Sequence, residues 1–227
     1  MLDDLVPVQP KPTAAKPLSG MTVLVVEDSR FASEALRLLC VHSGARVRRA
    51  DCLTSARRHL KVYRPSVVIV DLGLPDGSGE DLIRELDTAM PRVPVILGLS
   101  GEPDGEDTAR AAGADGFLAK PVEGLGAFQI AVLNALPEAD RPTGLRMVPS
   151  GEVHPDHAVL DEDILNACDL LAAARSREDY DYLAHFLHGL ALSAHDGELT
   201  AAVEAIREDR IDEVEALLRK RLGVAEG

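Results

Sequence analysis

The sequence is poor in cysteine and lacks long apolar runs. Its three cysteines, Cys40, Cys52 and Cys168, include no closely spaced pair, so they predict neither a disulfide framework nor a zinc site. No apolar run approaches the roughly 20 residues of a membrane-spanning helix. The N-terminus also lacks the basic and apolar segments of a signal peptide. These absences predict a protein of the reducing cytoplasm with no membrane partner.

Basic residues are scarce as well. The 227 residues include 24 Lys+Arg against 38 Asp+Glu, a net charge of −14. From residue 156 to the C-terminus the corresponding counts are 7 and 17, which give −10. A surface this acidic is repelled by phosphate backbones, and no helix–turn–helix with basic recognition residues is present. The sequence therefore predicts no nucleic-acid partner and makes a transcriptional regulator the less favoured alternative.

Apolar runs alternate with helical patterns between residues 21 and 136. The predicted strands cover residues 21–28, 46–50, 65–71, 93–100 and 115–120, and the helices that follow them cover residues 29–44, 54–63, 79–89, 104–114 and 124–136. Short connections between such pairs predict an α/β fold, a doubly wound five-stranded parallel sheet with helices on both faces. Ser29 and Thr54 are expected to cap the first two helices.

The remainder of the chain divides into three parts. Residues 1–20 are predicted to be a flexible tail, residues 137–158 a proline-rich linker, and residues 159–227 a small all-helical domain. In this domain Asp161 is expected to cap the first of four amphipathic helices, and a capping box of Ser176 and Asp179 to open the second. Four such helices form a bundle or pair with a second copy of the chain, so a homodimer is one alternative.

Side chains with reactive chemistry stand where the predicted strands end. Glu27 and Asp28 follow the first strand, Asp71 ends the third, and Ser100 and Lys120 end the fourth and fifth. Because ligands of such sheets bind beyond the carboxyl ends of the strands, we expect these side chains to converge. Crowded carboxylates attract a cation, and their hard oxygen ligands suit Mg²⁺. The lysine and serine can hold an anion, which makes Asp71 a candidate nucleophile for a phosphoryl group.

With these motifs in place, residues 21–136 resemble the receiver domain of two-component response regulators, the CheY-like family. The resemblance rests on the acidic pair, on "DLGLPDGSGEDL" around Asp71, on "VPVILGLS" with Ser100 and on "GADGFLAKP" with Lys120. It implies that Asp71 accepts a phosphoryl group from the phosphohistidine of a histidine kinase or a histidine phosphotransfer protein. It also implies that the domain catalyses only its own phosphorylation and dephosphorylation, so the protein is not expected to be an enzyme.

The resemblance further implies how the cofactor is bound. Asp28 and Asp71, together with the backbone carbonyl of Gly73, would bind Mg²⁺, and Glu27 would act mainly through water. A glycine at position 73 is less typical of the family, and it leaves this side of the site without a side chain.

Two more positions have roles that the resemblance implies. Ser100 would move to hydrogen-bond the new phosphate beside Lys120. Phe117 would then turn into the vacated space as an aromatic switch, and the change would shift the population of conformations on one face of the domain.

The second predicted C-terminal helix contains "AHFLHGLALSA". This segment resembles the histidine phosphotransfer (HPt) signature, with His185 as the phosphoryl carrier, His188 in the place of a lysine, and Gly189. All three are expected to face solvent, away from the apolar face of the helix. Three outputs are left open: protein–protein contact through the helical region, a phosphorelay between Asp71 and His185, and, less favoured, transcriptional regulation.

Overall fold

The computed structural model describes residues 11–138, 141, 151, 153 and 155–223. Half of the predicted N-terminal tail and most of the predicted linker therefore lie outside the described residues. Within the described part, apolar packing begins at Leu18, whose side chain is fully buried and whose amide donates to the carbonyl of Ser43. No helix in this part of the chain is both long and apolar enough to cross a membrane.

The centre of the first domain is a parallel sheet in the order β2-β1-β3-β6-β7. Its strands are β1 (Thr22–Val26), β2 (Arg46–Ala50), β3 (Val67–Asp71), β6 (Val95–Ser100) and β7 (Gly116–Ala119). The predicted five-stranded doubly wound sheet is confirmed. In β3, Val67 and Ile69 belong to one apolar cluster, whereas Val68 and Val70 belong to another. The strand is thus buried on both faces, as its unbroken apolar run predicts.

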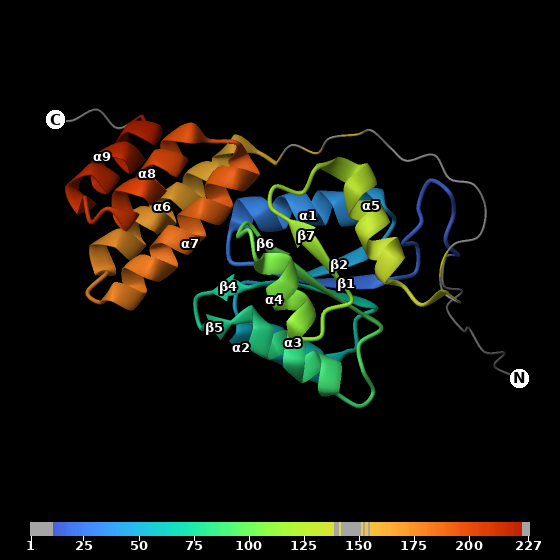
Figure 1. Ribbon diagram of the computed structural model, residues 1–227. Coiled ribbons are helices and arrows are strands. Elements are labelled where there is room, and N and C mark those ends of the chain that lie inside the picture. The colour runs from blue at the N-terminus through green and yellow to red at the C-terminus, as the bar shows by residue number, and fades with distance from the viewer. Residues whose placement is uncertain (1–10, 139–140, 142–150, 152, 154, 224–227) are drawn as a thin grey trace, which may run out of the picture.

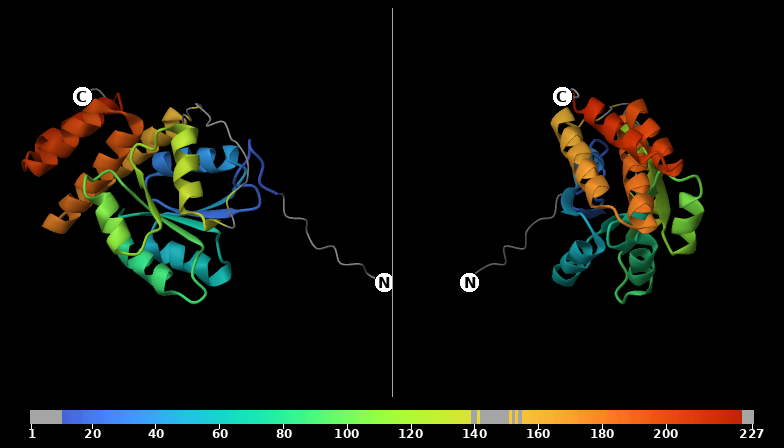
Figure 2. Two further views of the ribbon diagram at one scale, coloured as in Figure 1. Left: turned by 45° about the vertical axis from the view of Figure 1, so that its right-hand side comes forward. Right: turned by 90° about the vertical axis from the view of Figure 1, so that its left-hand side faces the viewer.

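Helices cover both faces of this sheet (Figures 1 and 2). One face packs against α1 (Arg30–His42) and α5 (Gly124–Ala135). The other packs against α2 (Leu53–Val62), α3 (Gly79–Thr88) and α4 (Gly105–Ala111). A short antiparallel pair, β4 (Gly73–Leu74) and β5 (Gly77–Ser78), follows β3 and was not predicted. It occupies the loop that leads from Asp71 into α3.

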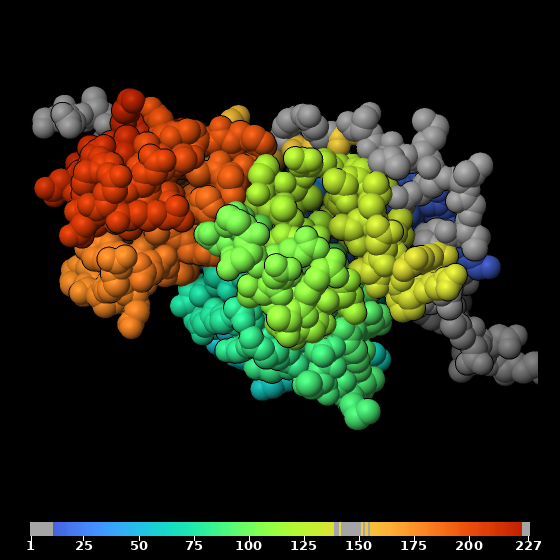
Figure 3. All heavy atoms as spheres, in the orientation of Figure 1, coloured from blue at the N-terminus to red at the C-terminus, as the bar shows by residue number. Residues whose placement is uncertain are grey.

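The C-terminal helices form a second core and sit at the carboxyl end of the sheet (Figure 1), packed against the first domain (Figure 3). They are α6 (His157–Ala173), α7 (Arg177–Ala194), α8 (Gly197–Arg207) and α9 (Ile211–Arg221). Their shared apolar cluster includes Leu187 and Leu190 of α7, and it extends to Phe31 of α1 in the first domain. The predicted all-helical region is confirmed, and α6 and α7 both contact α1.

The helix caps match the sequence in two places and differ in two. The Ser29 hydroxyl accepts from the amide of Ala32, and the capping box of Ser176 and Asp179 is formed. Helix α6, by contrast, begins earlier than expected, because Asp156 rather than Asp161 caps it.

Helix α2 is capped from a distant segment rather than by Thr54. It begins at Leu53, and its N-cap residue Cys52 makes no side-chain cap bond. Instead the carboxylate of Asp76, in the turn between β4 and β5, accepts from the amides of Leu53 and Thr54 at 2.7 and 2.9 Å and from the Thr54 hydroxyl at 2.8 Å. A carboxylate at this position offsets the positive end of the helix dipole. The bond joins residues 22 positions apart, which explains why local capping rules missed it.

Replacing Asp76 by alanine is expected to destabilise the protein by about 1 kcal/mol, the usual cost of losing a cap. Burial alone would raise the pKa of this carboxyl, but the bonds from Thr54 and Leu53 outweigh it and lower the pKa. The contribution is therefore complete above the unfolded value of about 3.9 and is lost as the pH falls through the lower folded value. Urea unfolding of wild type and Asp76→Ala between neutral and acidic pH measures this, and a difference that grows on acidification would contradict it.

Candidate functional site

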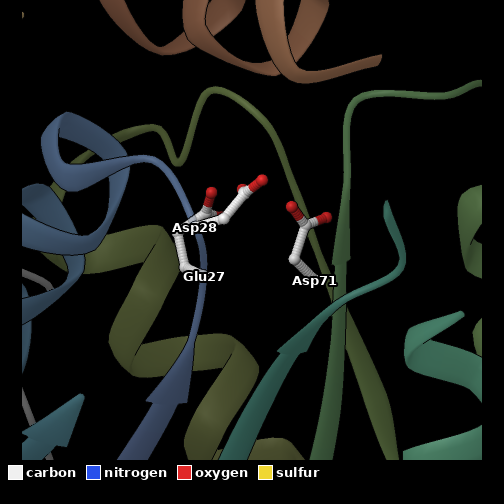
Figure 4. A group of neighbouring side chains, drawn as sticks. All are labelled: Glu27, Asp28 and Asp71. Carbon is white, nitrogen blue, oxygen red and sulfur yellow. The ribbon is translucent and has the colours of Figure 1, made fainter. Parts of the chain in front are cut away.

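Three carboxylates and one ammonium meet at the carboxyl ends of β1, β3 and β7. Glu27 and Asp28 follow β1, and Asp71 is the last residue of β3 (Figure 4). One oxygen from each lies within 4.8 Å of the others. Lys120, just beyond β7, places its Nζ 2.9 Å from Asp71 Oδ2 and 2.8 Å from Glu27 Oε2. The convergence that the strand order predicts is thus present in the structure.

Burial makes this cluster electrostatically demanding. The side chains of Glu27 and Asp71 are no more than 1% exposed, and that of Lys120 is 5% exposed. Burial raises the pKa of Glu27 well above its usual range and also raises that of Asp28, and the charge of Asp71 adds to both effects. For Asp71, burial is outweighed by the charge of Lys120 and by the neighbouring His185 side chain, which lower the pKa. The phosphoacceptor candidate is therefore the carboxylate of the cluster that is most firmly held ionised.

The donor set fits a hard divalent cation. Three carboxylates face one ammonium, so the site carries an excess of negative charge wherever all three are ionised. A cation bound among oxygen ligands removes the mutual repulsion that raises the pKa of Glu27 and Asp28. Oxygen-only ligation is the chemistry of Mg²⁺ and Ca²⁺. Asp28 and Asp71 could hold such an ion directly, with Glu27 close enough to contribute.

The other predicted residues surround this cluster. Ser100 ends β6, is buried, and accepts from the amide of Glu102 through its hydroxyl. Phe117 of β7 is partly buried and packs against α4, since an added Cβ at Gly105 would lie 3.0 Å from its ring. The amide of Gly73 lies 3.4 Å from Asp71 Oδ1. All the residues predicted from the receiver resemblance therefore lie at or around one edge of the sheet.

The expectation that His185, His188 and Gly189 face solvent was wrong. Gly189 is buried, and the two histidine side chains are 25% and 23% exposed. His185 Nε2 lies 4.0 Å from Asp71 Oδ1, and Figure 4 shows a C-terminal helix passing above the carboxylates. The face of α7 that is left over from its own apolar core is covered by the first domain. Helical periodicity correctly distinguished this face of α7 from the apolar face. It could not show that the first domain, rather than solvent, lies against it.

Two further side chains of the helical region reach the first domain, and the sequence analysis identified neither. Tyr182 donates its hydroxyl to Asp28 Oδ2 at 2.7 Å. Asp163 of α6 is 2% exposed and binds the first turn of α1, which has no acidic residue of its own. For Asp163 the sequence did hold a signal, an acidic residue on the apolar face of a predicted amphipathic helix. Asp163 occupies an apolar-face position between Leu160 and Ala167, where a carboxylate requires a partner.

Comparison with known proteins identifies the first domain. Residues 23–126 match the response regulator receiver domain. The chain is 39% identical over 116 residues to the KDP operon transcriptional regulatory protein KdpE of Escherichia coli (strain K12), covering 50% of each chain. It is 34% identical over 147 residues to the probable transcriptional regulatory protein TcrX of Mycobacterium tuberculosis (strain ATCC 25618 / H37Rv), covering 63% of this chain and 60% of that protein.

Among solved structures, the chemotaxis response regulator CheY4 of Vibrio cholerae is 27% identical, with a TM-score of 0.41, over 44% of this chain and 87% of that one. The chain spans about half the length of several curated relatives that it matches. Residues 23–126 are therefore a receiver domain of the two-component response regulators. The family match does not extend to the helical region.

Replacing Lys120 by methionine is expected to cost about 3–5 kcal/mol of stability in EDTA, because it leaves Glu27 and Asp71 buried without their cation. Mg²⁺ should recover part of the loss, since an ion that binds only the folded state stabilises it. Urea unfolding in EDTA and in MgCl₂ measures both effects, and Lys61→Met on the exposed side of α2 is the control. A loss no larger than that of the control would show that the buried ion pairs contribute little.

Proposed function

We propose that this protein is a response regulator of a two-component phosphorelay in which Asp71 is the phosphoacceptor. A phosphohistidine of a histidine kinase or phosphotransfer protein supplies the phosphoryl group. Its N–P bond breaks as an O–P bond to Asp71 forms, and the donor imidazole leaves with the nitrogen electron pair. The observation that carries the proposal is the buried Asp71 carboxylate, 2.9 Å from Lys120 and adjacent to two further acids.

The residues around Asp71 have separate roles in this proposal. Lys120 neutralises charge on the transferred group, which is the main task of a protein in phosphoryl transfer. Asp28, Asp71 and the Gly73 carbonyl hold Mg²⁺, with Glu27 acting through water, and the ion supplies further charge neutralisation. Ser100 hydrogen-bonds the phosphate once formed, and Phe117 follows it as the switch residue.

The proposed output is protein–protein contact rather than DNA binding. The helical region carries a net charge of −10 from residue 156 onward, which repels a phosphate backbone. KdpE and TcrX are transcriptional regulators by name, so DNA binding is the alternative that a low-salt binding assay with duplex DNA would reveal. Partners of the proposed output are a kinase, a phosphotransfer protein or a second copy of the chain, and the proposed site of action is the cytoplasm. The only proposed catalysis is that of Asp71 phosphorylation and dephosphorylation.

A second candidate is a relay within the chain, and one distance favours it. His185 Nε2 lies 4.0 Å from Asp71 Oδ1, which is longer than a hydrogen bond, and this proximity supports His185 as the second phosphoryl carrier of the relay. In such a relay the O–P bond to Asp71 breaks as an N–P bond to His185 forms. Lys120 lies beside Asp71 and also close to α7, because an added Cβ at Gly189 would be 3.1 Å from its Nζ.

The decisive experiment is phosphoryl transfer from a ³²P-labelled histidine kinase in Mg²⁺. Acyl phosphates are labile in base and phosphohistidine is labile in acid, so the stability of the label identifies the acceptor. We expect base-labile label in wild type, its loss in Asp71→Asn, and its retention in Asp104→Asn, which removes an exposed carboxylate after β6. Label that survives Asp71→Asn would exclude Asp71 as the acceptor.

The same assay tests the relay. Acid-labile label that disappears in His185→Ala and persists in His195→Ala would establish transfer to His185. His195 is the control, because it is an exposed histidine at the C-terminal end of the same helix. If no acid-labile label forms in any variant, the relay is excluded and the contact-based output remains.

A further inference from the structure

A carboxylate of the helical region is bound to the receiver domain by several hydrogen bonds. Asp163 of α6 accepts from the Ser29 hydroxyl at 2.8 Å and from the amides of Phe31 and Arg30 at 2.9 and 3.1 Å. These donors form the first turn of α1, where a negative charge is favoured by the helix dipole. Charge-assisted bonds of this kind are the strong ones, so Asp163 fixes α6 to the element that directly follows Asp28.

Apolar and polar contacts continue this attachment toward the phosphoacceptor. Phe31 of α1 is 6% exposed and packs into the apolar cluster of the helical region. Tyr182 of α7 donates to Asp28 Oδ2, the carboxylate proposed above to bind the metal. The helical region therefore hydrogen-bonds to a carboxylate of the proposed phosphoacceptor site and also packs on the surface beside that site.

Glycines on both sides allow α7 to approach this closely. An added Cβ at Gly73 would lie 1.8 Å from His185 Nε2, and one at Gly101 would lie 2.4 Å from Leu192 Cδ1. On α7 itself, an added Cβ at Gly189 would lie 3.1 Å from Lys120 Nζ. Gly73 and Gly101 flank the site in the loops after β3 and β6, so the imidazole of His185 fills the space that a side chain at position 73 would take.

We propose that α6 and α7 form a cover, in cis, for the phosphoacceptor site, with Gly73 and Gly101 as its seat and Asp163 as its anchor. The proposal rests on the function proposed above. A histidine from another protein must reach Asp71 from the side that His185 occupies, so the cover and an external donor exclude each other. Phosphorylation from outside then proceeds through the fraction of molecules in which the cover has left.

Removing the anchor tests the cover in the full-length protein. Asp163→Ala deprives three receiver donors of their acceptor in the covered state only, because water satisfies them when the cover has left. Asp169→Ala is the matched control, since Asp169 lies on the same helix and is exposed. The first readouts are the radius of gyration in solution and the rate at which diethyl pyrocarbonate modifies His185, relative to His42 in the same molecules.

If the cover exists, Asp163→Ala should have a larger radius of gyration than wild type. Its His185 should be modified about tenfold faster, because the covered state loses hydrogen bonds to a charged group. Asp71 phosphorylation by acetyl phosphate in Mg²⁺ should accelerate similarly. In that reaction the O–P bond of the donor breaks, an O–P bond to Asp71 forms and acetate leaves. Equal radius and modification rate in Asp163→Ala, Asp169→Ala and wild type would overturn the cover.

The seat is tested separately from the anchor. Gly73→Ala should drive the imidazole of His185 out of the space beside position 73, by rotation of its side chain or by displacement of α7, and so raise its rate of modification by diethyl pyrocarbonate relative to His42. Gly197→Ala, where an added Cβ has nothing within 4 Å, is the control. An unchanged modification rate of His185 in Gly73→Ala would refute the seat. If acetyl phosphate labels no variant while the radius still responds, the cover stands and the proposed phosphoacceptor function fails.

Discussion

The buried ammonium of Lys120 is the interaction on which the site depends. It lies within 3 Å of both Glu27 and Asp71, two carboxylates that are almost wholly removed from water. Without a cation between them, burial and mutual repulsion would favour their protonated forms, and a protonated Asp71 is no nucleophile. Burial alone would lower the pKa of Lys120, but the surrounding carboxylates outweigh it and raise the pKa. Lys120 and Asp71 thus hold each other in the ionised forms that the proposed phosphoryl transfer requires, whereas burial still raises the pKa of Glu27.

The receiver domain and its acidic site could be predicted from sequence because their determinants are local. Unbroken apolar runs identify strands buried on both faces, and the side chain that follows each run is brought to the common edge by the parallel topology alone. Asp71 and Lys120 needed no information about distant contacts. The Asp76 cap on α2 and the Asp163 bond to α1 did need it, since their partners lie 22 and more than 130 residues away. Capping rules describe neighbours in sequence, so they assigned the cap of α2 to Thr54 and, although they found the Ser29 cap of α1, gave no sign of Asp163.

The position of α7 could not be predicted for a related reason. Periodicity divides a helix into an apolar face and a remainder, and it treats the remainder as exposed. In α7 the remainder carries Tyr182, His185 and Gly189, all of which face the receiver. The sequence did contain a complementary signal, since Gly73 leaves the loop beside the site without a side chain. A glycine in a loop indicates a docking position only once the helix that fills the space of its missing side chain is known, and here that helix is α7.

Charge complementarity explains how a helical region with a net charge of −10 can pack on a cluster of three acids. Its many carboxylates do not face that cluster. The groups nearest to Asp28 and Asp71 are the Tyr182 hydroxyl and the His185 imidazole, a donor and a group that can bear positive charge. Among the described residues of this region, the one buried carboxylate, Asp163, lies instead against the positive end of α1. The contact therefore places donors on acids and an acid on backbone donors, so the net charge of the region does not oppose its docking. The same pairing would be lost on a phosphate backbone, which offers acceptors alone.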